Sequence, residues 1–323
     1  MSFSPAGHYP HHVCGHQALA NQQGRPQLYF CMSSHFSLLP HRSVLSVAGS
    51  DRVEFLQGLI SNDTRKVAPD CAIWAALLTP QGRFLNDMFV ADAGNDTFFL
   101  ETDRERAPTL AKKLKMYTLR SKVTVEDLGG MLEVAAAFGG DASKALDIEG
   151  AVSFVDPRLD TLGVRVVAPA GRAATLLAAR GFAEAPLAAY DALRLPLGVP
   201  DGSRDLLVEK ALLLENGFDE LNGVDWKKGC YMGQELTART KYRALIRKRL
   251  FPVKVEGTLP EPGTAVLQDG QEVGELRSGT GDRALAMLRL DAARGSGAAL
   301  MAGDARILPE IPPWMRLPET PAL

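Results

Sequence analysis

The sequence lacks several features that would assign it to a large functional class. Its four cysteines, Cys14, Cys31, Cys71 and Cys230, contain no CxxC pair and lack the spacing of a zinc site. No apolar run approaches the ~20 residues that a membrane-spanning helix needs. The net charge is only −2, so no overall basic field attracts nucleic acid or an anionic membrane. We therefore expect neither a membrane nor a nucleic acid as a partner.

The N-terminal stretch has no acidic residue before Asp51, and all six histidines lie between His8 and His41. Because it also lacks helical or strand periodicity, we expect residues 1–40 to be a disordered extension. Met32 is a candidate start, since an ordinary folded pattern begins just after it. The stretch is acid-poor but has few arginines, unlike a transit peptide. This favours the bacterial cytoplasm, with the mitochondrial matrix as the alternative.

The remaining chain alternates predicted strands and helices before it becomes all-β. Cys71–Leu78 and Arg83–Val90 are predicted strands, joined by a turn at 80–82, and Asp51 is expected to cap a helix together with Glu54. Short strands between Gly and Pro turns predict a small barrel after Phe251. This pattern predicts an α+β protein of three domains. The expected divisions are the extension 1–40, a first α+β domain 41–130, a second 131–245, a barrel 246–310 and a Pro-rich tail 311–323.

The clearest candidate for chemistry is Cys230, which lies in a glycine-rich turn just before a predicted helix, Gln234–Thr240. The N-terminal end of a helix carries a partial positive charge, and Lys227 and Lys228 immediately precede the turn. Both effects favour the thiolate, so we expect a reactive or metal-binding cysteine. The alternative is a buried structural thiol.

The same segment is basic, with eight Lys or Arg residues between Lys227 and Arg249 against one acid, Glu235. Such a cluster suits the binding of carboxylates or phosphates. The alternative is an ordinary solvated surface, which is how most charge runs behave.

The octapeptide KGCYMGQE resembles the signature of the YgfZ-type proteins, within the folate-binding, aminomethyltransferase-like superfamily. The continuation LTART and IRKRL is similar to the mitochondrial iron–sulfur assembly member. Further similar segments are FLQGLISND at Phe55–Asp63 and TPQGRFLND at Thr79–Asp87, so the resemblance covers most of the chain after residue 40. The signature positions are Lys228, Gly229, Cys230, Tyr231, Gly233, Gln234 and Glu235.

This resemblance implies a three-domain clover, shared with the T-protein of glycine cleavage, that ends in a small β-barrel. It also implies a central pocket for tetrahydrofolate or a derivative. A folate needs amide or carboxylate groups for its pterin edge, aromatic side chains for stacking, and basic groups for its tail. The candidates for the pterin edge are Asn62, Asp63, Asp87 and Glu215, and those for stacking and the tail are Tyr117, Arg120 and Arg239.

The resemblance further implies a role in the assembly or repair of iron–sulfur clusters, especially the four-iron type. The expected partners are iron–sulfur assembly proteins and client apoproteins. A thiolate is a natural ligand for such a cluster, but four thiolates normally share the task. Cys230 would then be a transient cluster ligand, a bridge between two chains, or a redox thiol.

Two other functions stay open. A folate-dependent aminomethyltransferase would need two adjacent acids, where this chain has Asn86 and Asp87, and asparagine cannot exchange a proton as a carboxylate does. A non-catalytic folate-binding scaffold is the second, and it would tolerate the loss of Cys230.

Overall fold

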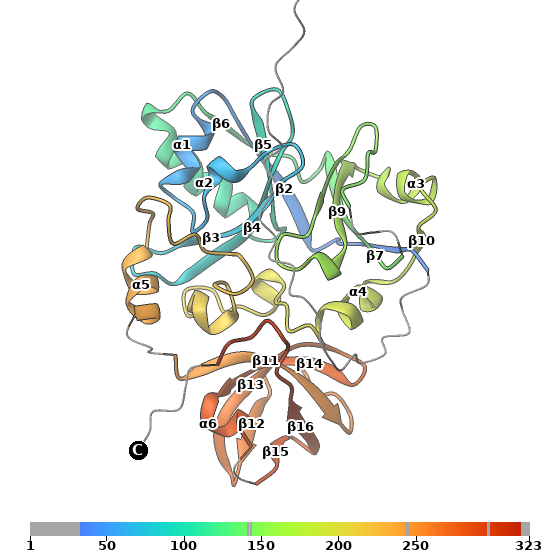
Figure 1. Cartoon of the computed structure of the whole chain (residues 1–323), viewed down its shortest axis with the longest axis vertical. Coiled ribbons are helices and arrows are strands. Elements are labelled where there is room, and N and C mark those ends of the chain that lie inside the picture. Colours follow the sequence, from blue (N-terminus) through green and yellow to red (C-terminus); the bar gives the residue numbers. More distant parts are fainter. Residues whose placement is uncertain (1–32, 141, 143, 243–245, 296–297, 318–323) are drawn as a thin grey trace, which may run out of the picture.

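The computed structural model describes residues 33–140, 142, 144–242, 246–295 and 298–317 (Figure 1). Its first sheet is antiparallel, with the strand order β3-β4-β5-β2-β6. The predicted hairpin is confirmed as β3 and β4. The elements are β2 (Arg42–Ala48), α1 (Arg52–Gln57), η1 (Thr64–Lys66), β3 (Ile73–Leu78), β4 (Phe84–Asp92), β5 (Thr97–Asp103), α2 (Ala107–Tyr117), η2 (Thr118–Arg120) and β6 (Thr124–Asp127).

Both faces of this sheet are covered, so every residue of β3 is buried. Successive side chains of a strand point to opposite faces. Accordingly Ile73, Ala75 and Leu77 share one core cluster with α1 and α2, while Trp74 and Ala76 belong to another. The continuous apolar composition of β3 follows from this double burial.

The expected capping pair of α1 is wrong. Asp51 precedes the helix, but its carboxylate accepts the backbone N–H of Lys122 at 2.8 Å and makes no cap hydrogen bond. Glu54 forms an ion pair with Arg65 instead. The pattern is local, whereas both partners come from other segments of the chain.

The second sheet has the order β10-β1-β7-β9-β8. Its strand β1 differs from the expectation of a disordered extension over 1–40, because it pairs antiparallel with β7 and parallel with β10. Residues 1–32 lie outside the described residues. The elements are β1 (His35–Leu38), β7 (Leu132–Phe138), β8 (Val152–Val155), η3 (Asp160–Leu162), β9 (Val164–Pro169), α3 (Ala173–Ala178), β10 (Ala183–Glu184) and α4 (Leu187–Arg194).

The C-terminal part forms a closed barrel in the order β11-β14-β13-β12-β15-β16, which confirms the predicted barrel. The two sheets lie side by side above it (Figure 1). Part of the expected tail packs back on the protein: Trp314 is buried and donates from Nε1 to the carbonyl oxygen of Leu197 at 2.7 Å. The elements are β11 (Lys248–Glu256), β12 (Ala265–Gln268), β13 (Gln271–Thr280), β14 (Arg283–Arg289), α6 (Leu290–Ala293), β15 (Leu300–Ala302) and β16 (Ala305–Pro309), preceded by η4 (Gly202–Arg204), η5 (Leu213–Asn216) and α5 (Gln234–Tyr242).

A buried network of ion pairs joins the sheets where they meet. Glu101 of the first sheet accepts from Arg42 at 2.9 Å and from Arg165 of the second sheet at 2.5 Å. Arg165 also donates to Asp156 at 3.2 Å. All four side chains are essentially inaccessible to solvent. Because an unpaired buried charge is strongly destabilising, this network holds the two sheets in one relative position.

Candidate functional site

The loop that carries the signature motif, residues 225–233, is called the signature loop. The side chain of Lys228 fixes it to the segment between α1 and η1. This lysine is buried, and its Nζ donates to the carbonyl oxygens of Ile60 and Asn62 at 2.5 and 2.6 Å. Burial lowers the pKa of Lys228 to about 8. Its ammonium also lies 5.2 Å from the centre of the Tyr231 ring. Lys228 therefore anchors the loop, and its charge is directed inward.

Asp225 secures the start of the same loop. Its Oδ1 accepts the backbone N–H groups of Lys227 and Lys228, at 2.6 and 3.0 Å, and its Oδ2 pairs with Lys66 at 2.5 Å. Asp225 is not among the site residues predicted from the sequence. An aspartate two residues before a turn that ends in glycine is a recognised signal for such a side-chain-capped turn.

Two glycines let the loop pack directly on the β3–β4 turn. Gly233 has φ +79°, and a Cβ there would lie 2.5 Å from the carbonyl oxygen of Thr79. Gly82 has φ +76°, and its Cβ would lie 2.8 Å from the carbonyl oxygen of Gly233. No other residue fits these positions without displacing backbone. The glycines of two sequence motifs thus meet at one contact.

Cys230 is a free, exposed thiol in this loop. It lies two residues beyond the anchor Lys228 and four before the first residue of α5, Gln234. Gly229 beside it has open space around its Cα. The exposure of the thiol contradicts the alternative of a buried structural cysteine, and the expected reactivity stays a prediction.

The signature residues that follow Cys230 make contacts within the protein. Tyr231 is buried, and burial raises its pKa to about 12. Gln234 accepts the backbone N–H of Tyr231 at 3.4 Å. Glu235 is exposed and pairs with Arg239 one helical turn later, at 2.8 Å.

Asn62 and Asp63 have structural partners. Asn62 is buried and donates to the carbonyl oxygens of Trp74 and Asn222 at 2.8 and 2.7 Å. Asp63 accepts from Gln57 and caps η1. Both residues therefore stabilise the segment 60–63, the platform on which the signature loop packs.

Tyr117 and Arg120 lie at the exposed end of α2. The Tyr117 hydroxyl lies 3.9 Å from Sδ of Met232, which places this end of the helix against the signature loop. Arg120 is exposed. Met116 and Leu119, from the same segment, expose 63% and 91% of their surface, so an apolar surface adjoins the loop that carries Cys230.

Asp87 lies in the buried network away from this loop. It accepts from Arg42 at 3.2 Å and from the indole Nε1 of Trp74 at 3.2 Å, with 1% of its surface exposed. Its neighbour Asn86 is buried too, and its amide nitrogen lacks a hydrogen-bond partner among the described residues. Both oxygens of Asp87 are therefore engaged by the protein itself.

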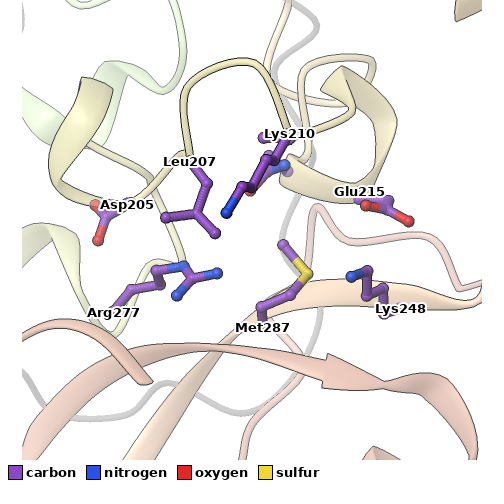
Figure 2. A pocket seen from close by; sticks show the side chains of 9 residues that line it. Asp205, Leu207, Lys210, Glu215, Lys248, Arg277 and Met287 are labelled. Carbon is purple, nitrogen blue, oxygen red and sulfur yellow. The ribbon is translucent and has the colours of Figure 1, made fainter. Parts of the chain in front are cut away.

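Glu215 lies in a third place, at a small cavity between the segment 205–216 and the barrel (Figure 2). Burial raises its pKa. The cavity has a volume of about 50 Å³, whereas sites for drug-sized ligands commonly enclose ~300–1,000 Å³. The cavity at Glu215 is therefore too small for a folate, and the folate site expected from the resemblance stays a prediction.

Known proteins resemble this chain in sequence and in structure. A family model described as the CAF17 C-terminal beta-barrel domain matches residues 247–317. The mouse mitochondrial iron–sulfur cluster assembly factor IBA57 is 36% identical over 282 residues, which cover 80% of this chain and 78% of the relative. The human protein gives 36% over 288 residues, with 80% and 78% covered. The chain belongs to the IBA57 family of iron–sulfur cluster assembly factors.

This finding confirms the resemblance to the mitochondrial assembly member. The IBA57 homologue of Mycosarcoma maydis is 35% identical over 236 residues, but the match covers 58% of that longer protein and 69% of this chain. These relatives are named as mitochondrial proteins. The cytoplasmic location expected for this chain stays a prediction.

The fold is shared more widely than the IBA57 family. The glycine cleavage aminomethyltransferase T of Bartonella henselae superposes with a TM-score of 0.70 at 16% identity, covering 89% of this chain and 88% of that one. At this identity the likeness concerns the fold alone. It confirms the predicted α+β architecture with its terminal barrel.

Proposed function

We propose that this chain assists the assembly of iron–sulfur clusters and that the thiolate of Cys230 binds a cluster in transit. Membership in the IBA57 family supports the general role. The observation that carries the specific one is the exposed, free thiol of Cys230 on a loop whose backbone is anchored on both sides. Such a thiol is accessible to a second protein without a change in the fold.

We treat the cluster as cargo, because the residues that the structure describes offer too few ligands to retain it. Within the described residues, no group of three or more His, Cys, Asp or Glu side chains could hold a metal ion. A cluster commonly takes four thiolates, so the remaining ligands come from an assembly protein or from a client apoprotein. A transient ligand and a bridge between two chains both fit this geometry. A redox thiol that acts on the partner is the further alternative.

The surface near Cys230 suits such a partner. Met116 and Leu119 are strongly exposed, and Tyr117 of the same segment contacts Met232 in the signature loop. Exposed apolar patches next to polar residues commonly mark protein interfaces. Among the residues that the structure describes, no helix is long and apolar enough to cross a membrane.

The proposal is tested by complementation of a strain that lacks its own protein of this family, with the activity of a four-iron enzyme as the readout. Wild type and the exposed barrel variant Gln271→Ala should restore activity. Cys230→Ala and Cys230→Ser should not, although both should accumulate as folded protein. Equal rescue by the cysteine variants would remove the thiol from the mechanism and favour the scaffold.

Folate binding remains a prediction from the family resemblance, and no step above depends on it. The aminomethyltransferase alternative is disfavoured by the position of Asp87, whose two oxygens accept from Arg42 and Trp74. Equilibrium dialysis of the purified chain with tetrahydrofolate tests the prediction directly. Saturable binding would support the folate proposal, and its absence would leave the thiol proposal intact.

A further inference from the structure

Three basic side chains and two acidic ones line the small cavity beside the barrel. Lys210 follows η4, Lys248 begins β11 and Arg277 lies in β13, and all three extend toward the same space (Figure 2). Neither lysine takes part in an ion pair within the described part of the chain. The cavity therefore collects cationic groups from three segments distant in sequence.

Arg277 is the group that indicates a ligand. Only 8% of its surface is exposed, and its Nη1 donates to Glu275 and to the carbonyl oxygen of Leu276. Its buried Nε has no hydrogen-bond partner among the described residues. An unsatisfied buried donor on a charged group is costly, and an incoming oxyanion would satisfy it. The planar guanidinium suits two-point contact with such an oxyanion.

The acidic residues at the cavity oppose an anion only weakly. Asp205 is neutralised by its own partners, since it accepts from Arg194 at 2.8 Å and from the Ser278 hydroxyl at 2.5 Å. Among the described residues the Glu215 carboxyl group has no hydrogen-bond partner, and burial raises its pKa. A protonated carboxyl group becomes a donor to an oxyanion. The side-chain oxygen of Asn216, also at the cavity, is buried and unsatisfied, so it opposes a bare oxyanion and accepts only from a protonated phosphate oxygen.

The size of the cavity limits what it can hold. Its volume is about 50 Å³, and a water-sized position requires ~10–15 Å³ on the same measure. There is thus room for about four oxygen-sized positions, which equals the number of oxygens in a phosphate group. A pterin or nucleoside ring exceeds this space.

We propose that the cavity formed by Lys210, Lys248 and Arg277 binds a phosphate group, either as inorganic phosphate or as the terminal group of a phosphate monoester. This site shares no residue with the Cys230 loop. A failure of either proposal therefore leaves the other standing.

The test is calorimetric titration of the full chain at constant ionic strength, with inorganic phosphate, glycerol phosphate and acetate as probes. Phosphate should bind saturably to wild type, and Lys248→Gln should weaken it about tenfold or more, since a charge-assisted contact is lost. Lys248 is exposed, so this variant should fold normally. Lys254→Gln, further along the same strand, is the matched control and should bind as wild type does.

A second variant tests the buried donor. Arg277→Lys keeps the charge but loses the planar fork, so it should also weaken phosphate binding. Saturable binding of glycerol phosphate with the same dependence on Lys248 would identify a monoester as the ligand, and binding of phosphate alone would identify the free ion. Equal affinity in wild type and both variants, binding of acetate as tight as that of phosphate, or no saturable binding would overturn the proposal.

Discussion

Replacing Lys228 by Met removes the buried ammonium that anchors the signature loop and keeps an apolar chain of similar length. In the folded protein Nζ donates to the carbonyl oxygens of Ile60 and Asn62 at 2.5 and 2.6 Å. Hydrogen bonds from charged donors contribute about 1.5–3 kcal/mol each. Against this stands the cost of burying the charge, about 3 kcal/mol for a pKa lowered from 10.5 to about 8. These opposing effects leave an expected loss of about 0–3 kcal/mol near neutral pH.

The pH dependence of this loss has a definite sign. Below a pH of about 8, Lys228 is protonated in both the folded and the unfolded chain. Between about 8 and 10.5 the folded protein has released a proton that the unfolded chain still binds, so wild-type stability gains from this group as pH rises. The Met variant has no such group. Its deficit relative to wild type should therefore widen across this window.

The assay is urea unfolding followed by circular dichroism, for wild type and Lys228→Met, at about pH 7 and about pH 10. Titrating groups distant from Lys228 are present in both proteins and cancel in the difference, and Tyr231, whose ring lies 5.2 Å from the ammonium, is replaced by Phe in both. A deficit that shrinks with rising pH would show that the carbonyl contacts outweigh burial and raise the pKa of Lys228. That result would refute the reasoning.

Three further predictions concern the glycine contact, the buried network and the thiol. Gly233→Ala should lower the free energy of unfolding by about 1–3 kcal/mol, because it combines a positive φ with a backbone clash, whereas Gly229→Ala, with open space around it, should change it little in the same urea experiment. Asp87→Asn should cost about 1–3 kcal/mol in thermal or urea unfolding, since it removes one charge partner of buried Arg42, which keeps Glu101; an unchanged midpoint would contradict the assigned pairing. Cys230→Ser should unfold at the same temperature as wild type but lose the fast phase of labelling by a thiol reagent, because the thiol is exposed; a fast phase that survives would come from another cysteine.

The elements with strong local signals could be predicted from the sequence. The hairpin of β3 and β4 combines β-rich segments with a glycine turn, and the barrel shows regular short strands. Strand β1 could not, because a four-residue segment gains its place only by pairing with β7, about a hundred residues later. Strand β15 is shorter still, with three residues, and its pairing with β12 is a matter of barrel closure.

The cysteine at the centre of the candidate site could be predicted from the sequence, but the contacts that hold its loop in place could not. A rare cysteine between glycines before a helix indicates Cys230 directly. The inward direction of Lys228 could not be foreseen, because its acceptors are backbone carbonyls of a segment far away in sequence. The same limit applies to Asp87, whose side chain faces partners that only the tertiary structure brings near. The residue types were compatible with a folate pocket, and that prediction stays open.

The docking of the signature loop on the segment around Ile60 and Asn62 has a consequence for the order of events during synthesis. The residues that accept Lys228 leave the ribosome about 170 residues before it does, and domains generally fold as units in N-terminal to C-terminal order. The platform can thus be in place when Cys230 emerges. The thiol joins a surface that already exists, and it is presented before the barrel that follows has been made.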